Sequence, residues 1–558
     1  MDAREFIDFA GAAAEYIADY LTSVRDRRVL PAVEPGYLRD LLPEAAPERP
    51  EHWRHVLADV ERVIMPGMTH WQSPRFHAYY PTGSSFAAMV GEMLSAGLGC
   101  IGFSWAASPV ATELETHMMD WLARLLALPE HFLNAAPGPG GGVLQGSASE
   151  ATLVALLAAK ERTVRRLLEE QPEQDAALLK TRLVAYTCDQ ANSSVEKAGL
   201  LASLPMRLLP SDAQGRLRAD VLQRAVDEDR ANGLLPCFVV ATLGSTPTCA
   251  FDPLPELGQL CQRERLWLHV DAAYAGTALL CPEYRHIAEG AELADSFCVN
   301  PHKWMLINFD CSAMWVRDSH QLVEAFTVDR IYLAHHKQGL APDYRNWQIP
   351  LGRRFRALKL WLVLRLHGAE GLRAHVRHQV ALARHFEALA RAHAAVHVAT
   401  VALGLVCFRL QGPEALTEEL LAALRTRGRI YVVAGAAEGR LVIRFCICSR
   451  LTRAADVDFA WEEIRQQAEA VLRAHGLANG VANDDTAAHV NGEVNRLTKG
   501  IVNGVTVTNG FTKSDANGAA HGFATSDSDA DGAESEIPMV ADMVTSQPPL
   551  PSAECKAV

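Results

Sequence analysis

The chain has 558 residues, of which 49% are hydrophobic, and its formal net charge at pH 7 is −13. This length is sufficient for a large buried core. Because no block of basic residues is present, the composition does not favour a protein that binds nucleic acid.

The twelve cysteines occur singly, without a C-x-x-C pair or a short secreted framework. This pattern favours a reduced, cytoplasmic protein. The first residues, Met1 to Val24, contain acidic side chains and no continuous apolar run, so we do not expect a signal peptide. No window has the apolar length of a membrane span.

The N-terminal part is expected to be mainly helical. Residues 4–24 carry apolar side chains at helical spacing, in a stripe wide enough to pack against another body. Further helices are expected over 53–63, 86–100 and 112–126. Proline-rich and aromatic stretches separate them and should be irregular.

From about residue 140 strand and helix patterns alternate. This alternation predicts an α/β fold, with a largely parallel sheet covered by helices on both faces. The candidate strands are 183–187, 238–243, 267–270, 296–299 and 313–316. The candidate helices are 147–168, 194–204, 219–233 and 256–264.

The C-terminal third predicts a long helical region over 353–397, and then a smaller α+β unit. The candidate strands of that unit are 405–410, 430–433 and 441–447. We therefore expect four parts. They are a helical segment 1–85, a large domain 86–352, a small domain 353–475 and a tail 476–558.

The tail differs in kind, since it repeats Asn-Gly and holds eleven acidic but only four basic residues. Such a composition buries too little apolar surface to offset chain entropy, which predicts disorder.

A possible anion site follows the glycine-rich stretch Pro137–Gly142. The run Ser147-Ala148-Ser149 opens a long helix, and free amides at a helix start can bind one phosphate. No Lys-Ser or Lys-Thr follows the glycines, so a nucleotide triphosphate is not indicated. The alternative is ordinary helix capping, because Ser147 and Glu150 have capping-box spacing.

Two further residues carry candidate chemistry. Asp271 ends an apolar strand, and a buried carboxylate there needs a cationic partner such as a pyridinium nitrogen. The alternative is a simple turn aspartate. Lys303 stands among apolar and aromatic residues in Asn300-Pro301-His302-Lys303-Trp304, where desolvation would favour the neutral, nucleophilic amine. The alternative is a surface lysine.

Taken in order, a phosphate cradle, a carboxylate and a lysine at successive strand ends match the requirements of pyridoxal 5'-phosphate (PLP). The motifs that carry a family resemblance are Trp71, Ala78-Tyr79-Tyr80-Pro81-Thr82, Ile101-Gly102-Phe103-Ser104-Trp105, Gly146-Ser147-Ala148-Ser149-Glu150, Val270-Asp271-Ala272-Ala273-Tyr274, Asn300-Pro301-His302-Lys303-Trp304 and Asp343-Tyr344-Arg345. The chain resembles, over about residues 1–475, the aromatic L-amino acid decarboxylases, which are fold-type I PLP enzymes. The resemblance implies a large domain with a mostly parallel seven-stranded sheet, a small C-terminal domain, and an N-terminal segment in the interface of a homodimer.

The resemblance also implies roles for individual residues. Lys303 would hold PLP as a Schiff base, and Asp271 would pair with its ring nitrogen. The residues that would hold or flank the phosphate are Ser147, Ala148, Ser149, Asn300 and His302. Thr246 would lie close to the ring. The residues that would line the substrate pocket are Trp71, Tyr79, Tyr80, Pro81 and Thr82, with Ile101 and Phe103 from the partner subunit. Tyr332 would lie on a mobile loop, about Val328 to Leu340, that closes over the substrate.

One departure from the family pattern concerns the product. Asn192 stands where the family usually has a catalytic histidine that stacks on the cofactor. A carboxamide does not titrate near neutrality, so protonation after loss of CO2 would be hindered and O2 could react instead. Asparagine here resembles the insect 3,4-dihydroxyphenylacetaldehyde synthase branch, which implies a role in cuticle hardening. The alternative is that Asn192 only precedes a helix capped by Ser193 and Glu196.

The resulting hypothesis is a PLP enzyme that converts L-DOPA, with O2 as co-substrate, into the aldehyde, CO2, ammonia and hydrogen peroxide. One alternative is a plain decarboxylase that releases dopamine or another amine. Another is a catalytically silent binding protein. No metal site is expected, and the adjacent His335 and His336 are interpreted as solvated loop residues.

Overall fold

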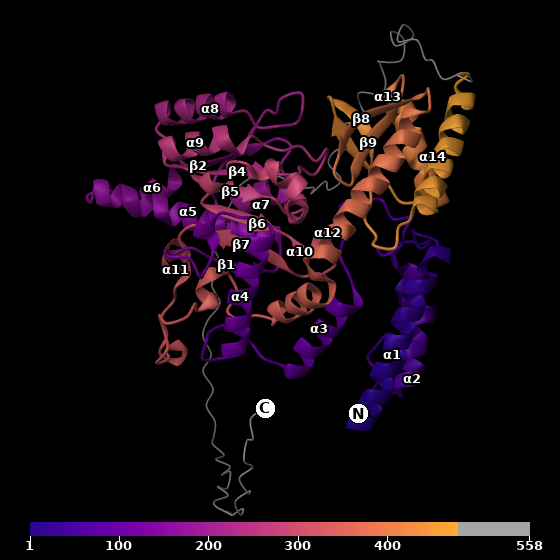
Figure 1. Ribbon diagram of the computed structural model, residues 1–558, viewed down its shortest axis with the longest axis horizontal. Helices are drawn as coiled ribbons and strands as arrows, with labels where there is room; N and C mark the ends of the chain where they lie inside the picture. Colours follow the sequence, from indigo (N-terminus) through magenta and orange to yellow (C-terminus); the bar gives the residue numbers. More distant parts are fainter. Residues whose placement is uncertain (478–558) are drawn as a thin grey trace, which may run out of the picture. The chain divides into compact units, whose positions relative to one another are not determined.

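The structure is a computed structural model that describes residues 1–477 (Figure 1). Residues 478–558 lie outside the described part, and with them nearly all of the tail for which disorder is predicted. Within the described part, none of the helices is long and apolar enough to cross a membrane.

A seven-stranded sheet forms the centre of the chain. Its strands are β1 (Gly141–Gln145), β2 (Leu183–Cys188), β3 (Met206–Leu209), β4 (Leu235–Thr242), β5 (Trp267–Asp271), β6 (Ser296–Val299) and β7 (Ser312–Val316). They lie in the order β1-β7-β6-β5-β4-β2-β3. Only β7 runs antiparallel to its neighbours, so the predicted mostly parallel sheet is confirmed.

Two strands of this sheet were not among the predicted strands. β1 begins with two glycines, and only Val143 and Leu144 give it an apolar signal. β3 lies at the edge of the sheet and is mostly half-buried or exposed, so it lacks a continuous apolar run. Both strands depend on pairing with distant segments rather than on local pattern.

Helices cover both faces of the sheet. Consecutive residues of each strand point to opposite faces, and both faces carry apolar side chains that must be buried. In β4, Phe238 and Val240 pack in one core, whereas Val239 and Ala241 pack in another. The helices of this part are α4 (Pro109–Leu125), α5 (Ala148–Glu170), α6 (Ala176–Thr181), α7 (Ser193–Leu201), α8 (Ala219–Ala231), α9 (Leu254–Glu264), α10 (Pro301–Trp304) and α11 (His320–Phe326). The predicted fold class is therefore confirmed.

The C-terminal part contains a four-stranded antiparallel sheet with the order β10-β11-β9-β8. Its elements are α12 (Arg356–Arg391), β8 (Val396–Ala402), β9 (Leu405–Leu410), α13 (Glu414–Arg427), β10 (Val433–Ala437), β11 (Arg440–Cys446) and α14 (Ala454–Ala474). α12 is interrupted at Gly368, which has φ of 62°.

Two predictions for this part are wrong. The helix predicted to reach residue 397 ends at Arg391, because Val396 already pairs with Leu410 in the small sheet. The strand predicted over 430–433 begins only at Val433, and Tyr431 forms an isolated bridge with Phe76 instead.

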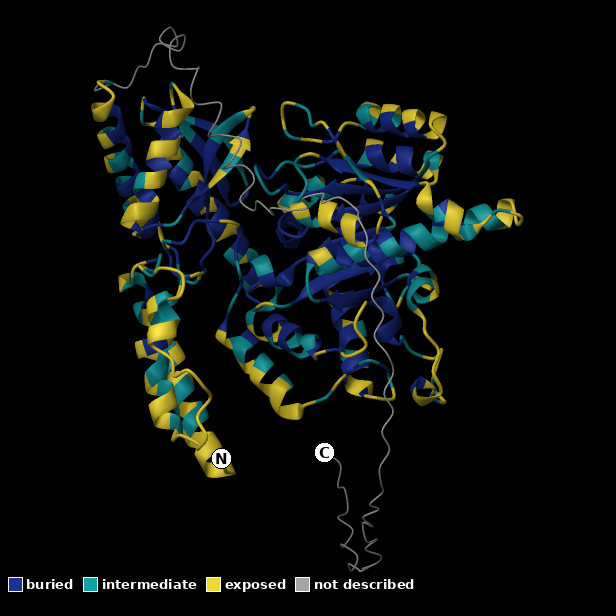
Figure 2. Cartoon of the chain, turned by 180° about the vertical axis from the view of Figure 1, so that it is seen from behind, coloured by how far each residue is buried: buried dark blue, intermediate teal, exposed yellow. Residues whose placement is uncertain are grey.

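The N-terminal segment contains α1 (Ala3–Ser23) and α2 (Trp53–Asp59), which continues as one π-helical turn, and α3 (Phe86–Leu98) follows it. Phe9 stacks on Trp53 with ring centroids 5.2 Å apart. Much of α1 is nevertheless exposed, as Figure 2 shows in yellow, and the exposed residues include Phe6 and Ile7. The predicted apolar stripe is thus only partly covered within one chain.

Candidate active site

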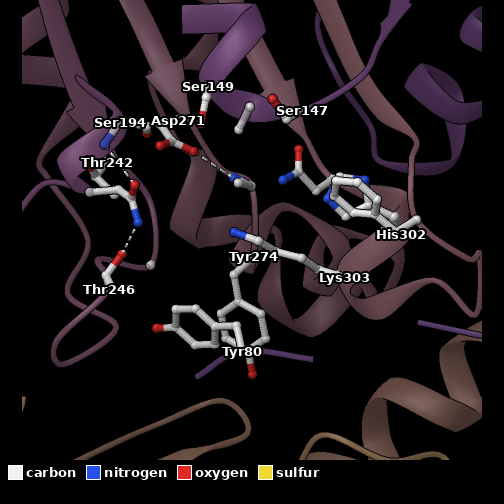
Figure 3. A pocket seen from close by; sticks show the side chains of 16 residues that line it. Tyr80, Ser147, Ser149, Ser194, Thr242, Thr246, Asp271, Tyr274, His302 and Lys303 are labelled. Carbon is white, nitrogen blue, oxygen red and sulfur yellow. Dashed lines mark hydrogen bonds between the residues drawn. The ribbon is translucent and has the colours of Figure 1, made fainter. Parts of the chain in front are cut away.

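A cavity of about 240 Å³ opens at the carboxyl ends of β4, β5 and β6. This edge of an open α/β sheet is a common place for ligands. The residues that line it are Tyr80, Ser147, Ala148, Ser149, Asn192, Ser194, Thr242, Gly244, Thr246, Asp271, Ala273, Tyr274, Asn300, His302, Lys303 and Phe309. Figure 3 shows them converging from several elements.

Lys303 lies in the short helix α10, immediately after β6 and Asn300. Its side chain extends into the cavity, so the surface alternative is wrong (Figure 3). Burial lowers the pKa of the Lys303 amine, although the nearby Asp271 carboxylate acts in the opposite direction. The amine is therefore more readily neutral, and hence nucleophilic, than a surface lysine.

Asp271 is the last residue of β5 and is only 5% exposed. Its Oδ1 atom accepts the backbone N–H of Ala273 at 3.0 Å and faces the thiol of Cys298 at 3.8 Å. Asp271 thus makes the hydrogen bond of a turn aspartate, which was the alternative interpretation of this residue. The same carboxylate also lines the cavity, where a cationic partner would compensate its burial.

The N-terminus of α5 forms one end of the cavity. Ser147 caps the helix by accepting the N–H of Glu150 at 3.2 Å, whereas the Glu150 carboxylate accepts the N–H of Gly146. The predicted capping box is therefore only half correct. The helix dipole and the free amides of this first turn favour an anion next to Ala148 and Ser149.

His302 and Asn300 lie beside this anion site. Nδ1 of His302 accepts the backbone N–H of Cys311 at 2.8 Å, which leaves Nε2 as the N–H donor of a neutral ring. Burial, together with the neighbouring Lys303 cation, lowers the pKa of His302 to about 3. Asn300 accepts the hydroxyl of Ser312 at 2.7 Å and keeps its amide N–H groups for a ligand.

Asn192 and Thr246 meet on another wall of the cavity. The Asn192 oxygen accepts the N–H of Ser194 at 2.9 Å and caps α7, while its amide donates to the Thr246 hydroxyl at 2.9 Å. The predicted capping box of Ser193 and Glu196 is wrong, because Asn192 is itself the cap. The Asn192 side chain therefore does both: it caps α7 and it lines the cavity.

Aromatic side chains form the floor below Lys303. Tyr80 donates its hydroxyl to the carbonyl of Ser245 at 2.8 Å and stacks on Tyr274, with centroids 3.9 Å apart. Tyr274 in turn stacks on Trp304 at 4.8 Å. The Tyr80 ring centroid lies 5.8 Å from the Lys303 nitrogen.

Sequence reasoning assigned no role to several lining residues. These are Ser194, Thr242, Gly244, Ala273, Tyr274 and Phe309. Tyr274 could have been found, because it follows the Asp271 motif by three residues. Phe309 gives no comparable local signal. The Thr242 hydroxyl is buried without a hydrogen-bond partner in the described part of the chain, as expected of a wall that faces a ligand.

Other predicted site residues do not line this cavity within one chain. Trp71 and Tyr79 stack on each other at 5.3 Å, and Pro81 lies beside Thr82, which lines a small adjoining space that also reaches Lys303. Ile101 is 56% exposed, and Phe103 is half-buried. Tyr332 is 75% exposed and lines a separate hollow.

His335 corrects another expectation. Its side chain is only 8% exposed, and Nε2 lies 3.0 Å from the Asp343 carboxylate, so it is not a solvated loop residue. Asp343 also faces Arg345 at 3.7 Å. Among the described residues, no group of three or more His, Cys, Asp and Glu side chains is arranged to hold a metal ion.

The lining of the cavity fits PLP. An anion site, a buried carboxylate and the Lys303 amine surround one space, and the lining residue Thr242 has a buried hydroxyl without a hydrogen-bond partner in the described part of the chain. Lys303 would hold the cofactor, Asp271 its ring nitrogen, and the start of α5 its phosphate.

Comparison with known proteins gives a consistent picture. Residues 35–411 match the family model described as the pyridoxal-dependent decarboxylase conserved domain. The chain is 53% identical over 477 residues to an aromatic-L-amino-acid decarboxylase of Manduca sexta, covering 85% of this chain and 94% of that one. It is 54% identical over 470 residues to a 3,4-dihydroxyphenylacetaldehyde synthase of Drosophila melanogaster, covering 84% and 92%. Among solved structures, Oryza sativa TDC with PLP and tryptamine superimposes with a TM-score of 0.81 at 37% identity, covering 84% and 99%.

Proposed function

Because the chain belongs to the aromatic L-amino acid decarboxylases, within the pyridoxal-dependent decarboxylase family, we propose that it is a 3,4-dihydroxyphenylacetaldehyde synthase. The reaction consumes L-DOPA, O2 and water. It releases 3,4-dihydroxyphenylacetaldehyde, CO2, ammonia and hydrogen peroxide. PLP-dependent decarboxylation is the activity of the family, and coupled oxidative deamination is the proposed addition.

The observation that carries the proposal is the way the Asn192 carboxamide is hydrogen-bonded at the wall of the cavity. Both ends of its carboxamide are engaged, with Ser194 and with Thr246, and a carboxamide does not exchange a proton near neutral pH. The side chain at this wall can hold a polar group in place but cannot act as a general acid. A relative at 54% identity carries the name of the aldehyde synthase, which supports the same conclusion.

PLP, when bound, withdraws electrons from the amino acid so that CO2 can leave. The protein residues then control the fate of the substrate carbon. Asp271 would pair with the ring nitrogen of the cofactor, and Lys303 would supply the attachment point. His302 and the start of α5 fix the anionic end. With Asn192 unable to deliver a proton, oxygen competes successfully for the reactive carbon.

Two further parts of the proposal concern elements outside the cavity. Exposed apolar side chains on α1 and α3, among them Phe6 and Met93, support a homodimer that buries them. In that dimer Ile101 and Phe103 would complete the substrate pocket of the partner. Tyr332 would close over the substrate on its mobile loop. Sedimentation velocity tests the assembly, and a monomer at micromolar concentration would contradict it.

The deciding experiment is one incubation of the holoenzyme with L-DOPA under air. Dopamine, aldehyde, CO2, O2 uptake and peroxide are measured together. The proposal expects about one peroxide and one O2 for each CO2, as the balanced reaction requires. Stoichiometric dopamine without O2 uptake would instead establish the second candidate, a plain decarboxylase. That candidate has its own support, since the relative from Manduca sexta carries that name.

The possibility of a silent binding protein is tested by cofactor attachment. The purified chain should absorb near-visible light with PLP, and borohydride reduction should fix the cofactor to Lys303. Mass spectrometry of the peptide that contains Lys303 reads the result. Absence of attachment would refute every enzymatic proposal.

A further inference from the structure

Arg444 is a buried cation beside the candidate active site. It lies in β11, is 3% exposed and forms no ion pair with any described carboxylate. Its Nη2 atom is buried without a hydrogen-bond partner, and its guanidinium lies 5.1 Å from the ring centroid of Tyr80. Burying a charge without a counter-charge is costly, so the position of this side chain calls for a reason.

The contact that Arg444 does make is to a loop of the large sheet. Its Nε donates to the carbonyl of Pro247 at 3.0 Å. Tyr80 donates to the carbonyl of Ser245 at 2.8 Å. These two carbonyls belong to the residues on either side of Thr246. The backbone that carries the Thr246 hydroxyl is thus held on both sides by side chains from distant parts of the chain.

The backbone around Arg444 is shaped for this contact. A Cβ atom at Gly435 of β10 would lie 2.6 Å from Cδ of Arg444 and 3.6 Å from the carbonyl oxygen of Pro247. The absence of a side chain at Gly435 therefore lets Arg444 pass the neighbouring strand and reach the loop. This observation is independent of the hydrogen bond and points to the same arrangement.

We propose that Arg444 is a positioning residue that fixes Thr246 and, through it, the carboxamide of Asn192. The Thr246 hydroxyl accepts the Asn192 amide, and the Asn192 oxygen accepts the Ser194 N–H. If Thr246 moves, the amide loses its partner and can leave its orientation. The small antiparallel sheet thereby contributes to the partition between amine and aldehyde. This inference rests on the proposed role of Asn192 in that partition.

The test is a double-mutant cycle on the holoenzyme with L-DOPA, with peroxide per CO2 and kcat for CO2 release measured together. Arg444→Met should change the peroxide-to-CO2 ratio by about threefold or more, a coupling at the low end for residues in one network. Arg444→Lys, which keeps a donor, should restore part of the wild-type ratio. Gly435→Ala should shift the ratio in the same direction as Arg444→Met. Arg440→Met on the same strand, where Arg440 holds the carbonyl of Gly412, is the matched control and should keep the ratio.

In the Asn192→Ala background Arg444→Met should no longer change the ratio, because the positioned group is absent. The inference is overturned if Arg444→Met acts equally in both backgrounds. It is also overturned if Arg444→Lys, Arg444→Met and Gly435→Ala, each folded by circular dichroism, keep the wild-type ratio. If wild type forms no peroxide, the proposed aldehyde synthase fails. The coupling of Arg444 to Asn192 is then decided by kcat for CO2 release in the same cycle.

Discussion

The side-chain amide of Asn192 donates a 2.9 Å hydrogen bond to the hydroxyl of Thr246, 54 residues further along the chain. Its oxygen is held by the N–H of Ser194 at the same distance. A flipped amide would place its NH2 group against the Ser194 N–H, so the two bonds define one orientation. The residue that caps α7 is therefore also a fixed wall of the cavity.

Replacing Asn192 with histidine should move the products towards dopamine. An imidazole can accept the capping N–H, as His52 does for Arg54 at the start of α2, so the fold should tolerate it. A titratable ring can then supply a proton near neutral pH. We expect peroxide per CO2 to fall by about tenfold, which corresponds to ~1.4 kcal/mol in the partition. The matched control is Asp175→His, which places a histidine at the cap of α6 and should leave peroxide per CO2 unchanged. An unchanged peroxide yield in Asn192→His would argue against Asn192 as the residue that decides the product.

Thr246 provides a complementary test of the same contact. Thr246→Val removes the hydroxyl that accepts the Asn192 amide while keeping the shape of the side chain. It should alter peroxide per CO2 by about threefold or more, in the range for a lost side-chain hydrogen bond. Thr246→Ser, which retains the hydroxyl, should stay close to wild type. Equal ratios in both variants would show that the hydrogen bond has no influence on the products.

The buried amine of Lys303 makes a prediction about cofactor attachment. Because burial lowers its pKa, a larger fraction of the amine is neutral at pH 7 to 9 than for a surface lysine. The rate at which apoenzyme takes up PLP should accordingly reach its plateau below the ordinary lysine pKa of about 10.4. Stopped-flow absorbance across pH measures this rate. Lys303→Ala should abolish borohydride labelling, and Lys160→Met, which removes a lysine bonded to Ala202, should retain it.

Buried histidines predict loss of stability in mild acid. Burial lowers the pKa values of His77 and His269 to about 4 and that of His302 to about 3. In the unfolded chain these histidine rings take up protons near pH 6.5, whereas in the folded chain they stay neutral until about pH 4 or below. The stabilisation is therefore complete above pH 6.5 and is lost as the pH falls towards 4.

Each such group contributes up to ~1.4 kcal/mol per pH unit to the slope of the free energy of unfolding. His77→Gln removes one such group and should reduce that slope by up to ~1.4 kcal/mol per pH unit between pH 5 and 6.5. Urea titrations at several pH values measure the slope. The exposed His336→Gln serves as the comparison. A slope that does not differ between wild type and His77→Gln would contradict the assignment of a buried neutral ring.

The loop that carries Tyr332 should be held by two contacts. His335 binds the Asp343 carboxylate, and Arg345 donates to the carbonyl of Leu333 at 3.0 Å. Removing the first contact with His335→Ala should speed tryptic cleavage after Arg330 or Lys337 severalfold, because cleavage follows local opening. His336→Ala, whose ring is exposed, should leave the rate unchanged. Identical digestion of the two variants would show that His335 does not restrain the loop.

Much of the large sheet and the position of its site could be predicted because the signals are local. Asp271 ends one short apolar strand and Lys303 follows another, and parallel strands bring their carboxyl ends to one edge. The sequence alone therefore placed both residues at one site. It could not locate β3 or β8, whose half-exposed residues lack a continuous apolar run and depend on pairing.

The tertiary structure alone decided the contacts between distant segments. Tyr274 stacks on Tyr80 in the cavity floor, and the buried His335 lies opposite Asp343. Arg444 reaches Pro247 across 197 residues. No periodicity or motif encodes such distances, because they depend on how the two sheets pack. The sequence thus determined the cofactor chemistry, and the packing of the fold decided how the carboxamide of Asn192 is held.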